Sequence, residues 1–158
     1  MAFKNDLSFT SKVDNPAYEL AMNIRLTGTI LSKEGDRILR PIGLTDSQFN
    51  VLMVLKYQTQ DGVMNQTVLG NILQVNRSNI TGLVDRMEQA GWVKRSADRK
   101  DRRVNHVRIT RKGHTILSKA EKVYFEYFES IFGKIAKKDQ QQAARFMERF
   151  REEIRPRQ

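Results

Sequence analysis

The feature that most constrains this chain is residues 65–113, where a short amphipathic segment, a three-residue corner, a second amphipathic segment and a basic hairpin follow one another. The apolar residues of the second segment repeat at i, i+3, i+4 and i+7, which predicts one buried helix face: Ile80, Leu83, Val84 and Met87. The corner, residues 74–76, is too brief for anything but a turn between two helices. Two strands are expected within 92–95 and 104–109. This order predicts a winged helix-turn-helix in a chain that is mainly α with a small β-wing.

Polar residues that can accept backbone N–H bonds are expected to set the helix starts. Thr45 and Gln48 have the spacing of a capping box, in which each side chain bonds the other residue's backbone. Further starts are expected at five single capping residues: Asn15, Asn65, Asn76, Thr110 and Asp139. Gly91 is expected to end the second helix of the motif.

Helical stripes flank the motif on both sides, which divides the chain into four expected parts. Residues 1–14 lack a clear period and are expected to form a flexible N-terminal arm. Residues 15–43 are expected to form a dimerisation helix, 44–110 the winged helix-turn-helix domain, and 111–158 the remaining dimerisation helices. The apolar bands of the flanking helices are wide for a chain of 158 residues to cover alone. Mutual burial in a homodimer is therefore expected.

The charge of the chain favours a polyanionic partner. There are 28 Lys and Arg residues against 18 Asp and Glu, a net charge of +10. Residues 94–113 hold nine basic and two acidic residues, so most of the excess lies in and around the hairpin. Lys and Arg side chains that neutralise phosphates release counterions, which makes double-stranded DNA the expected partner.

Other classes of function find little support in the sequence. There is no Gly-rich phosphate loop, no nucleophile–base set and no metal-ligand cluster, so neither an enzyme, a cofactor nor a metal site is expected. The chain has no cysteine, which fits a reducing cytoplasm and excludes thiol-based sensing. The longest apolar run, residues 51–55, is far too short to cross a membrane. A cytoplasmic protein is expected.

The second helix of the motif carries the expected major-groove residues on its polar face. Short polar side chains are cheap to desolvate and suit a helix whose first turns read base edges. The candidates are Arg77, Ser78, Asn79, Thr81, Gly82 and Arg86. For Ser78 and Asn79 the alternative is simple capping of the helix. Arg86 could instead pair with a neighbouring acid, although exposed pairs contribute little.

The basic loop between the two strands supplies the expected wing contacts. Arg103 is the first candidate for the minor groove, where negative potential is focused at A·T-rich steps. Arg99, Lys100 and Arg102 are better placed as phosphate contacts, which give salt dependence and no sequence information. The alternative is a basic loop that touches phosphates without a fixed arrangement.

These residues, in this order, resemble the MarR family of bacterial winged-helix regulators. The stretch 44–52 (LTDSQFNVL) is similar to that family's entry into its second helix, and 75–88 (VNRSNITGLVDRME) is similar to its recognition helix. Residues 101–103 (DRR) and 107–113 (VRITRKG) resemble its wing and the exit into its fifth helix. Gly70 and Trp92 depart from the usual pattern, both away from the expected reading surface.

The resemblance implies a homodimer that places two winged helices on a pseudo-palindromic operator and acts as a repressor. It implies that Asp101 holds Arg103 in an extended pose. It also implies a pocket between the dimer helices and the DNA-binding lobe for a small phenolic or metabolite effector. Aromatic residues are candidates for lining such a pocket or, alternatively, for core and dimer contacts: Tyr18, Tyr57, Tyr124, Tyr127 and Phe128. A low-specificity architectural DNA-binding protein is the alternative function.

Overall fold

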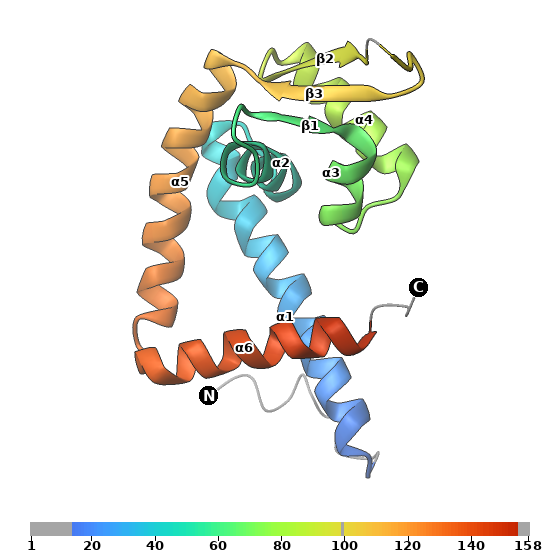
Figure 1. Cartoon of the computed structure of the whole chain (residues 1–158). Coiled ribbons are helices and arrows are strands. Elements are labelled where there is room, and N and C mark those ends of the chain that lie inside the picture. Colours follow the sequence, from blue (N-terminus) through green and yellow to red (C-terminus); the bar gives the residue numbers. More distant parts are fainter. Residues whose placement is uncertain (1–13, 99, 155–158) are drawn as a thin grey trace.

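The computed structural model describes residues 14–98 and 100–154. The predicted arm, except for Asp14, and Arg99 of the predicted wing lie outside the described residues. Figure 1 shows the elements, which follow the chain in this order: α1 (Pro16–Leu39), the 3-10 helix η2 (Arg40–Ile42), α2 (Asp46–Tyr57), β1 (Val63–Asn65), α3 (Gln66–Ile72), α4 (Arg77–Gln89), β2 (Val93–Ala97), β3 (Asn105–Ile109), α5 (Arg111–Phe132) and α6 (Lys137–Ile154). The predicted fold class is confirmed: helices dominate, and a small wing follows the helix-turn-helix.

The predicted caps explain where most helices begin. In the capping box of α2, Gln48 N–H donates to the Thr45 hydroxyl and the Gln48 side chain accepts from Thr45 N–H. Each of the other α-helices up to α5 starts after a residue whose side chain accepts first-turn N–H bonds: Asn15, Asn65, Asn76 and Thr110. The cap predicted at Asp139 is wrong, because α6 already begins at Lys137 and Asp139 lies in its first turn.

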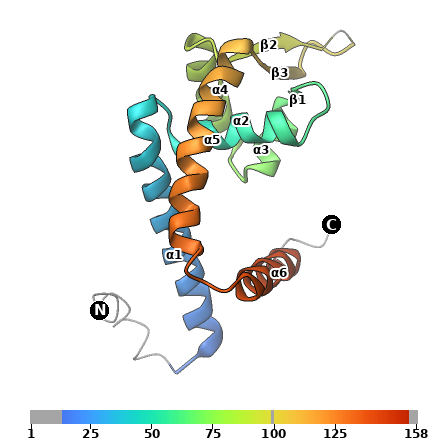
Figure 2. The same cartoon turned by 90° about the vertical axis from the view of Figure 1, so that its left-hand side faces the viewer.

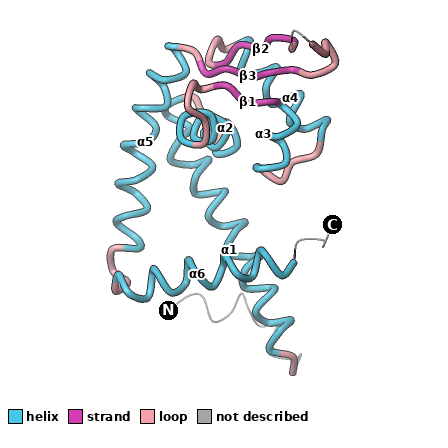
Figure 3. Tube along the Cα trace, in the orientation of Figure 1, coloured by secondary structure: helices cyan, strands magenta, loops and turns pink. Residues whose placement is uncertain are grey.

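The three strands form one antiparallel sheet at one end of the molecule, in the order β1-β3-β2 (Figure 3). Because side chains alternate along a strand, cross-strand partners share a face. The pairs Val93–Ile109 and Arg95–Val107 therefore place one arginine on the same face as three apolar side chains that are buried. His106 and Arg108 alternate with Val107 and Ile109 along β3 and so point to the opposite face.

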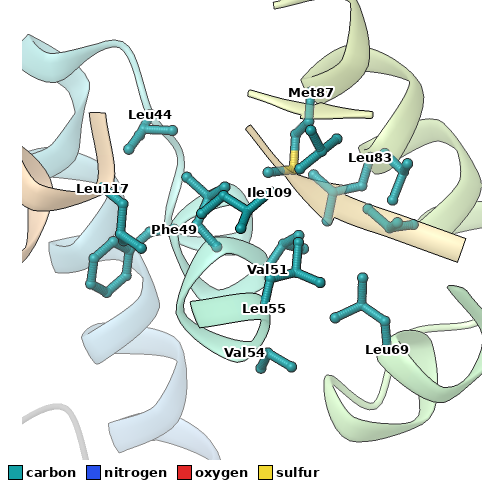
Figure 4. Packing of buried hydrophobic residues seen from close by; sticks show 14 of the residues in the cluster. Leu44, Phe49, Val51, Val54, Leu55, Leu69, Leu83, Met87, Ile109 and Leu117 are labelled. Atoms are coloured by element: carbon teal, nitrogen blue, oxygen red, sulfur yellow. The ribbon is translucent and has the colours of Figure 1, made fainter. Parts of the chain in front are cut away.

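The core lies between α2, α4 and the sheet, with α5 closing one side (Figure 4). The predicted apolar face of α4 is buried: Ile80, Leu83, Val84 and Met87. Phe49, Val51, Leu52 and Leu55 of α2 lie at the centre of the cluster. Burial of this face fixes which side of α4 is turned outward.

The long helices extend away from the winged helix. α1 and α5 pack against each other, and α6 turns sharply away from α5 (Figures 1 and 2). No residue of α6 is buried, although its Phe146 and Phe150 rings stack with centroids 6.3 Å apart. Within residues 14–98 and 100–154, no helix combines the length and apolar character needed to span a membrane.

Candidate nucleic-acid interface

The first turns of α4 present a polar, outward-facing surface. Arg77, Ser78, Asn79 and Arg86 are exposed. Thr81 and Gly82 are half-buried. The predicted major-groove candidates therefore share the side of α4 opposite its buried stripe, which is the side a DNA duplex can approach.

The cap of α4 separates the roles of Ser78 and Asn79. The Asn76 carboxamide oxygen accepts from the backbone N–H of Asn79 and from the Ser78 hydroxyl, both at 2.9 Å. The capping alternative therefore applies to the Ser78 side chain, whose hydroxyl hydrogen is bonded within the protein. For Asn79, only the backbone N–H takes part in the cap. Among the described residues, none is bonded to the Asn79 side-chain amide, which has the donor and acceptor needed to pair with adenine.

Thr81 is held by bonds on both sides of its hydroxyl. Its Oγ1 donates to the Arg77 carbonyl at 2.8 Å and accepts from Gln66 Nε2 of α3 at 3.0 Å. The hydroxyl hydrogen is therefore committed. At the Gly82 position an added Cβ would lie 3.5 Å from Arg86 Nη1, so the guanidinium group of Arg86 passes close to this glycine.

Backbone-to-carboxylate bonds shape the wing turn. Asp98 Oδ1 accepts from the N–H of Lys100 at 2.7 Å and of Asp101 at 3.1 Å, and Asp98 Oδ2 lies 2.9 Å from His106 Nε2. The Lys100 N–H bond, followed by the bonds from His106 and Asp101, lowers the pKa of Asp98. Asp101 Oδ1 accepts from the N–H of Arg103 at 2.9 Å. Asp101 thus holds the backbone at Arg103, and no carboxylate in the described part of the chain pairs with the Arg103 guanidinium group.

Arg77 and Arg103 both line a small hollow between the helix-turn-helix and the wing. The hollow has a volume of about 70 Å³ and is lined by residues from α3, the corner, α4 and the wing: Gln66, Thr67, Gly70, Asn71, Val75, Arg77, Ile80, Arg103 and Asn105. Two arginines from separate segments therefore border one hollow, and guanidinium groups at such a place can bind a phosphate-rich strand. Lys100 and Arg102 are exposed on the wing nearby in sequence.

Sequence reasoning missed two residues that flank α4, Gln66 and Arg95. Arg95 Nη2 donates to Asp85 Oδ1 at 2.7 Å, and the Arg95 N–H donates to Glu88 Oε1 at 2.7 Å. Asp85 and Glu88 therefore bond to Arg95, and the pairing of Arg86 with either of them that the sequence left open does not occur. Alternation along β2 places Arg95 on the inward face, beside Val107 of β3, but only the position of α4 shows what it bonds.

The aromatic residues near α5 pack as core residues. Tyr124 stacks on Phe49 with ring centroids 4.4 Å apart and lies 4.6 Å from Phe128 by the same measure. The Tyr124 hydroxyl bonds Asp46 at 3.5 Å, and burial raises its pKa to about 12. Tyr57 donates to Glu121 at 2.7 Å. These contacts support the core alternative for Tyr124 and Phe128, which pack against the core, whereas Tyr57 is 59% exposed.

A helix-turn-helix followed by a basic hairpin defines the chain as a winged-helix protein. The sequence model of the MarR family matches residues 42–104, which include the whole recognition helix and most of the wing. The transcriptional activatory protein BadR of Rhodopseudomonas palustris is 35% identical over 100 residues, and the regulator PecS of Dickeya dadantii is 23% identical over 110 residues. Residues 42–104 of this chain therefore match the MarR family.

The matched regions are partial. They cover 63% of this chain and 57% of BadR, and 70% of this chain and 66% of PecS, so the chain spans less than two thirds of either relative. Among solved structures, the MarR family regulator Sco3205 of Streptomyces coelicolor, in complex with DNA, superposes with a TM-score of 0.80. The two chains are 21% identical, and the superposition covers 90% of this chain and 94% of Sco3205. This likeness supports the fold over the flanking helices as well as the winged helix.

Proposed function

We propose that this protein is a sequence-specific transcriptional regulator that binds a pseudo-palindromic operator as a homodimer and represses transcription. The single observation that supports DNA binding best is the surface formed by α4 and the wing. On it, a polar helix start carries the Asn79 amide, which bonds no described residue, and two arginines, Arg77 and Arg103, line one hollow. The amide suits base readout, and the guanidinium groups suit phosphate or minor-groove contact.

The proposed contacts divide into two groups. In the major groove they are Arg77, Ser78, Asn79, Thr81, Gly82 and Arg86. In the wing they are Arg99, Lys100, Asp101, Arg102 and Arg103, with Asp101 acting by holding the wing backbone. Since the hydroxyl hydrogens of Ser78 and Thr81 are used internally, these two residues would meet the bases through an oxygen lone pair or, for Thr81, through its methyl group.

The apolar surfaces of the long helices support the proposed dimer. Large apolar side chains remain exposed on α1, α5 and α6: Leu20, Leu26, Ile30, Val123, Phe125, Ile131, Phe132, Phe146 and Ile154. Such surfaces are typical of protein–protein interfaces. Residues 15–43 and 111–158 therefore remain our proposed dimerisation parts, and 44–110 the proposed DNA-binding domain. A two-fold dimer would place its two α4 helices in successive major grooves, about 34 Å apart.

Mobility-shift titrations after selection of bound sequences from random DNA test the proposal. Recovery of one palindromic consensus is expected, with binding that weakens steeply as salt rises. Arg103→Ala should lose affinity most for operators with A·T-rich flanks, and Asn79→Ala should relax base preference. Selection of no consensus would instead support the architectural alternative. Unchanged binding by both variants would refute the site assignment.

Release by a small phenolic or metabolite ligand is the remaining part of the proposal. An effector can act only by binding better to a dimer whose α4 spacing does not fit successive grooves. Repeating the titration with candidate ligands tests this point separately, because a ligand without effect leaves DNA binding intact. A cytoplasmic location follows from a role on the chromosome.

A further inference from the structure

Two side chains outside the proposed DNA contacts connect the polar face of α4 to the elements beside it. Gln66, the first residue of α3, donates through Nε2 to Thr81 Oγ1 at 3.0 Å. Arg95, in the middle of β2, forms an ion pair with Asp85 at 2.7 Å and donates its backbone N–H to Glu88 at 2.7 Å. Thr81 and Asp85 are four residues apart, so they lie one turn apart on one face of α4.

The position of Arg95 is unfavourable for the stability of the folded state. It occupies the inward face of the sheet beside Val107, which is fully buried, and its own side chain is 22% exposed. Its Nε is buried with no hydrogen-bond partner among the described residues, and the same holds for Gln66 Oε1. An unpartnered buried polar atom destabilises the folded state, so an apolar side chain at either position would serve packing better. The contacts these residues make with α4 have a purpose other than packing.

Three hydrogen bonds hold α4 in place, at two levels along the helix. The Gln66–Thr81 bond ties the helix to α3 close to the proposed reading residues. The Arg95–Asp85 and Arg95–Glu88 bonds tie its second half to the wing. Apolar packing allows a helix to slide or rotate slightly, whereas directional bonds at two levels on one side fix its rotation. A small rotation of α4 changes which base edge the Asn79 amide meets.

We propose that Gln66 and Arg95 are positioning residues that fix the orientation of α4 against α3 and the wing, and so set base preference without touching DNA. The proposal rests on the proposed function, since it concerns how the same helix reads its operator. It separates two kinds of basic residue in the wing region: arginines that contact the duplex, and one arginine that holds the reading helix.

Arg95→Met is the central variant, because it keeps the length and apolar stem of the side chain and removes the guanidinium donors, while the backbone bond to Glu88 stays in place. Affinity is measured for the selected operator and for versions with single base changes in the major-groove positions. The ratio between the two affinities is expected to fall about tenfold, within the range that one base contact contributes. The slope of log affinity against log salt should stay unchanged, whereas loss of a phosphate contact would reduce it by about 1.

Matched variants separate positioning from folding. Arg95→Lys keeps the charge but lacks the planar fork, and should recover only part of the base preference. Asp85→Asn removes the carboxylate charge on α4 while keeping one acceptor oxygen, and should lower the preference in the same direction as Arg95→Met, with little further loss in the double variant. Gln66→Met should act in the same direction. Arg108→Met is the control. Arg108 lies on the outward face of the same sheet, and its ion pair with Asp61, at 3.7 Å, is exposed. This variant should leave the base preference unchanged.

Three outcomes would overturn the inference. The first is Arg95→Met binding with an unchanged base profile and a salt slope reduced by about 1, which would make Arg95 a phosphate contact. The second is Arg95→Met binding with both the base profile and the salt slope unchanged. The third is equal loss of preference in Arg95→Met and Arg108→Met. Thermal unfolding of each variant shows that the fold persists, and Asp85→Asn provides the same test should Arg95→Met fail to fold. If the wild-type protein selects no consensus, the proposed function itself fails, which is a separate result.

Discussion

Gly113 offers the sharpest test of how the winged helix is joined to α5. It is buried in the first turn of α5, where an added Cβ would lie 2.1 Å from the Trp92 carbonyl oxygen and 2.9 Å from Ile109 Cγ1. An ordinary C···O contact is about 3.3 Å, so Gly113→Ala must push α5 and the start of the wing apart by about 1 Å. The Trp92 carbonyl also accepts two bonds from Thr110, at 3.0 Å and 3.1 Å, which this movement strains.

The expected effect of Gly113→Ala is a loss of about 3 kcal/mol in the free energy of unfolding. Overpacking costs about 1–3 kcal/mol, and each weakened hydrogen bond about 1 kcal/mol. The better helix propensity of alanine returns about 1 kcal/mol. For a chain of this size the unfolding temperature should fall by roughly 6–12 °C.

Gly28→Ala is the matched control, since it makes the same substitution inside α1, where an added Cβ meets nothing within 4 Å. Here only the propensity term acts, and stability should rise by about 0.5–1 kcal/mol. Both variants are unfolded thermally at one protein concentration, because dimerisation makes the transition concentration-dependent. A Gly113→Ala protein that unfolds at or above the wild-type temperature would refute the reasoning.

Three further predictions concern other polar contacts. Thr110→Ala removes the cap of α5 and should cost about 1–2 kcal/mol in thermal unfolding, with Thr110→Ser as a milder control. Glu121 is 9% exposed and accepts a hydrogen bond from Lys56 at 2.8 Å. Lys56 is about one third exposed, so its ammonium group can be hydrated when its partner is removed. Glu121→Ala should therefore lower the free energy of unfolding by about 2 kcal/mol, less than the loss of one partner from a fully buried ion pair. A loss as small as that of an exposed pair would contradict this. The folded-state pKa of Asp98 is lowered, so its contribution is present above the unfolded value of about 3.9 and is lost as pH falls through the folded value. Asp98→Asn should therefore reduce stability at pH 7 and not in strong acid, with the carboxyl midpoint followed by NMR.

The sequence predicts the helices well where local chemistry decides them. Thr45 with Gln48 and Asn76 are caps whose bonds depend only on residues two or three positions away, so spacing alone identifies them. The face of α4 follows from a period of 3.6 residues in the same way. The cap predicted at Asp139 was wrong because α6 begins two residues earlier, at Lys137, so Asp139 lies inside its first turn.

What spacing could not supply is the identity of partners from distant segments. Gln66 and Thr81 are 15 residues apart, and nothing in either position predicts their bond. Arg95 falls on an inward strand position, which by pattern should be apolar. Its role is evident only when Asp85 and Glu88 are seen opposite it. For the wing, the resemblance implied that Asp101 holds Arg103, but not that it does so through the Arg103 backbone N–H, nor that Asp98 accepts from two N–H groups of the same turn.

The sequence also could not predict what covers α6, and this matters for how DNA binding could be regulated. Periodicity defines an apolar stripe, but not the surface that covers it, and in the single chain the α6 stripe is left exposed. In the proposed dimer a second copy covers the stripes of α1, α5 and α6 together. The first turn of α5 is bound to the start of the wing through Thr110 and the close approach of Gly113 to Trp92. Since β2 in turn holds α4 through Arg95, a change in how the two α5 helices pack would be transmitted by directional contacts, first to the wing and then to the reading helix. In the proposed dimer we therefore expect the spacing of the two α4 helices, and with it the affinity for DNA, to change when a molecule binds between the long helices.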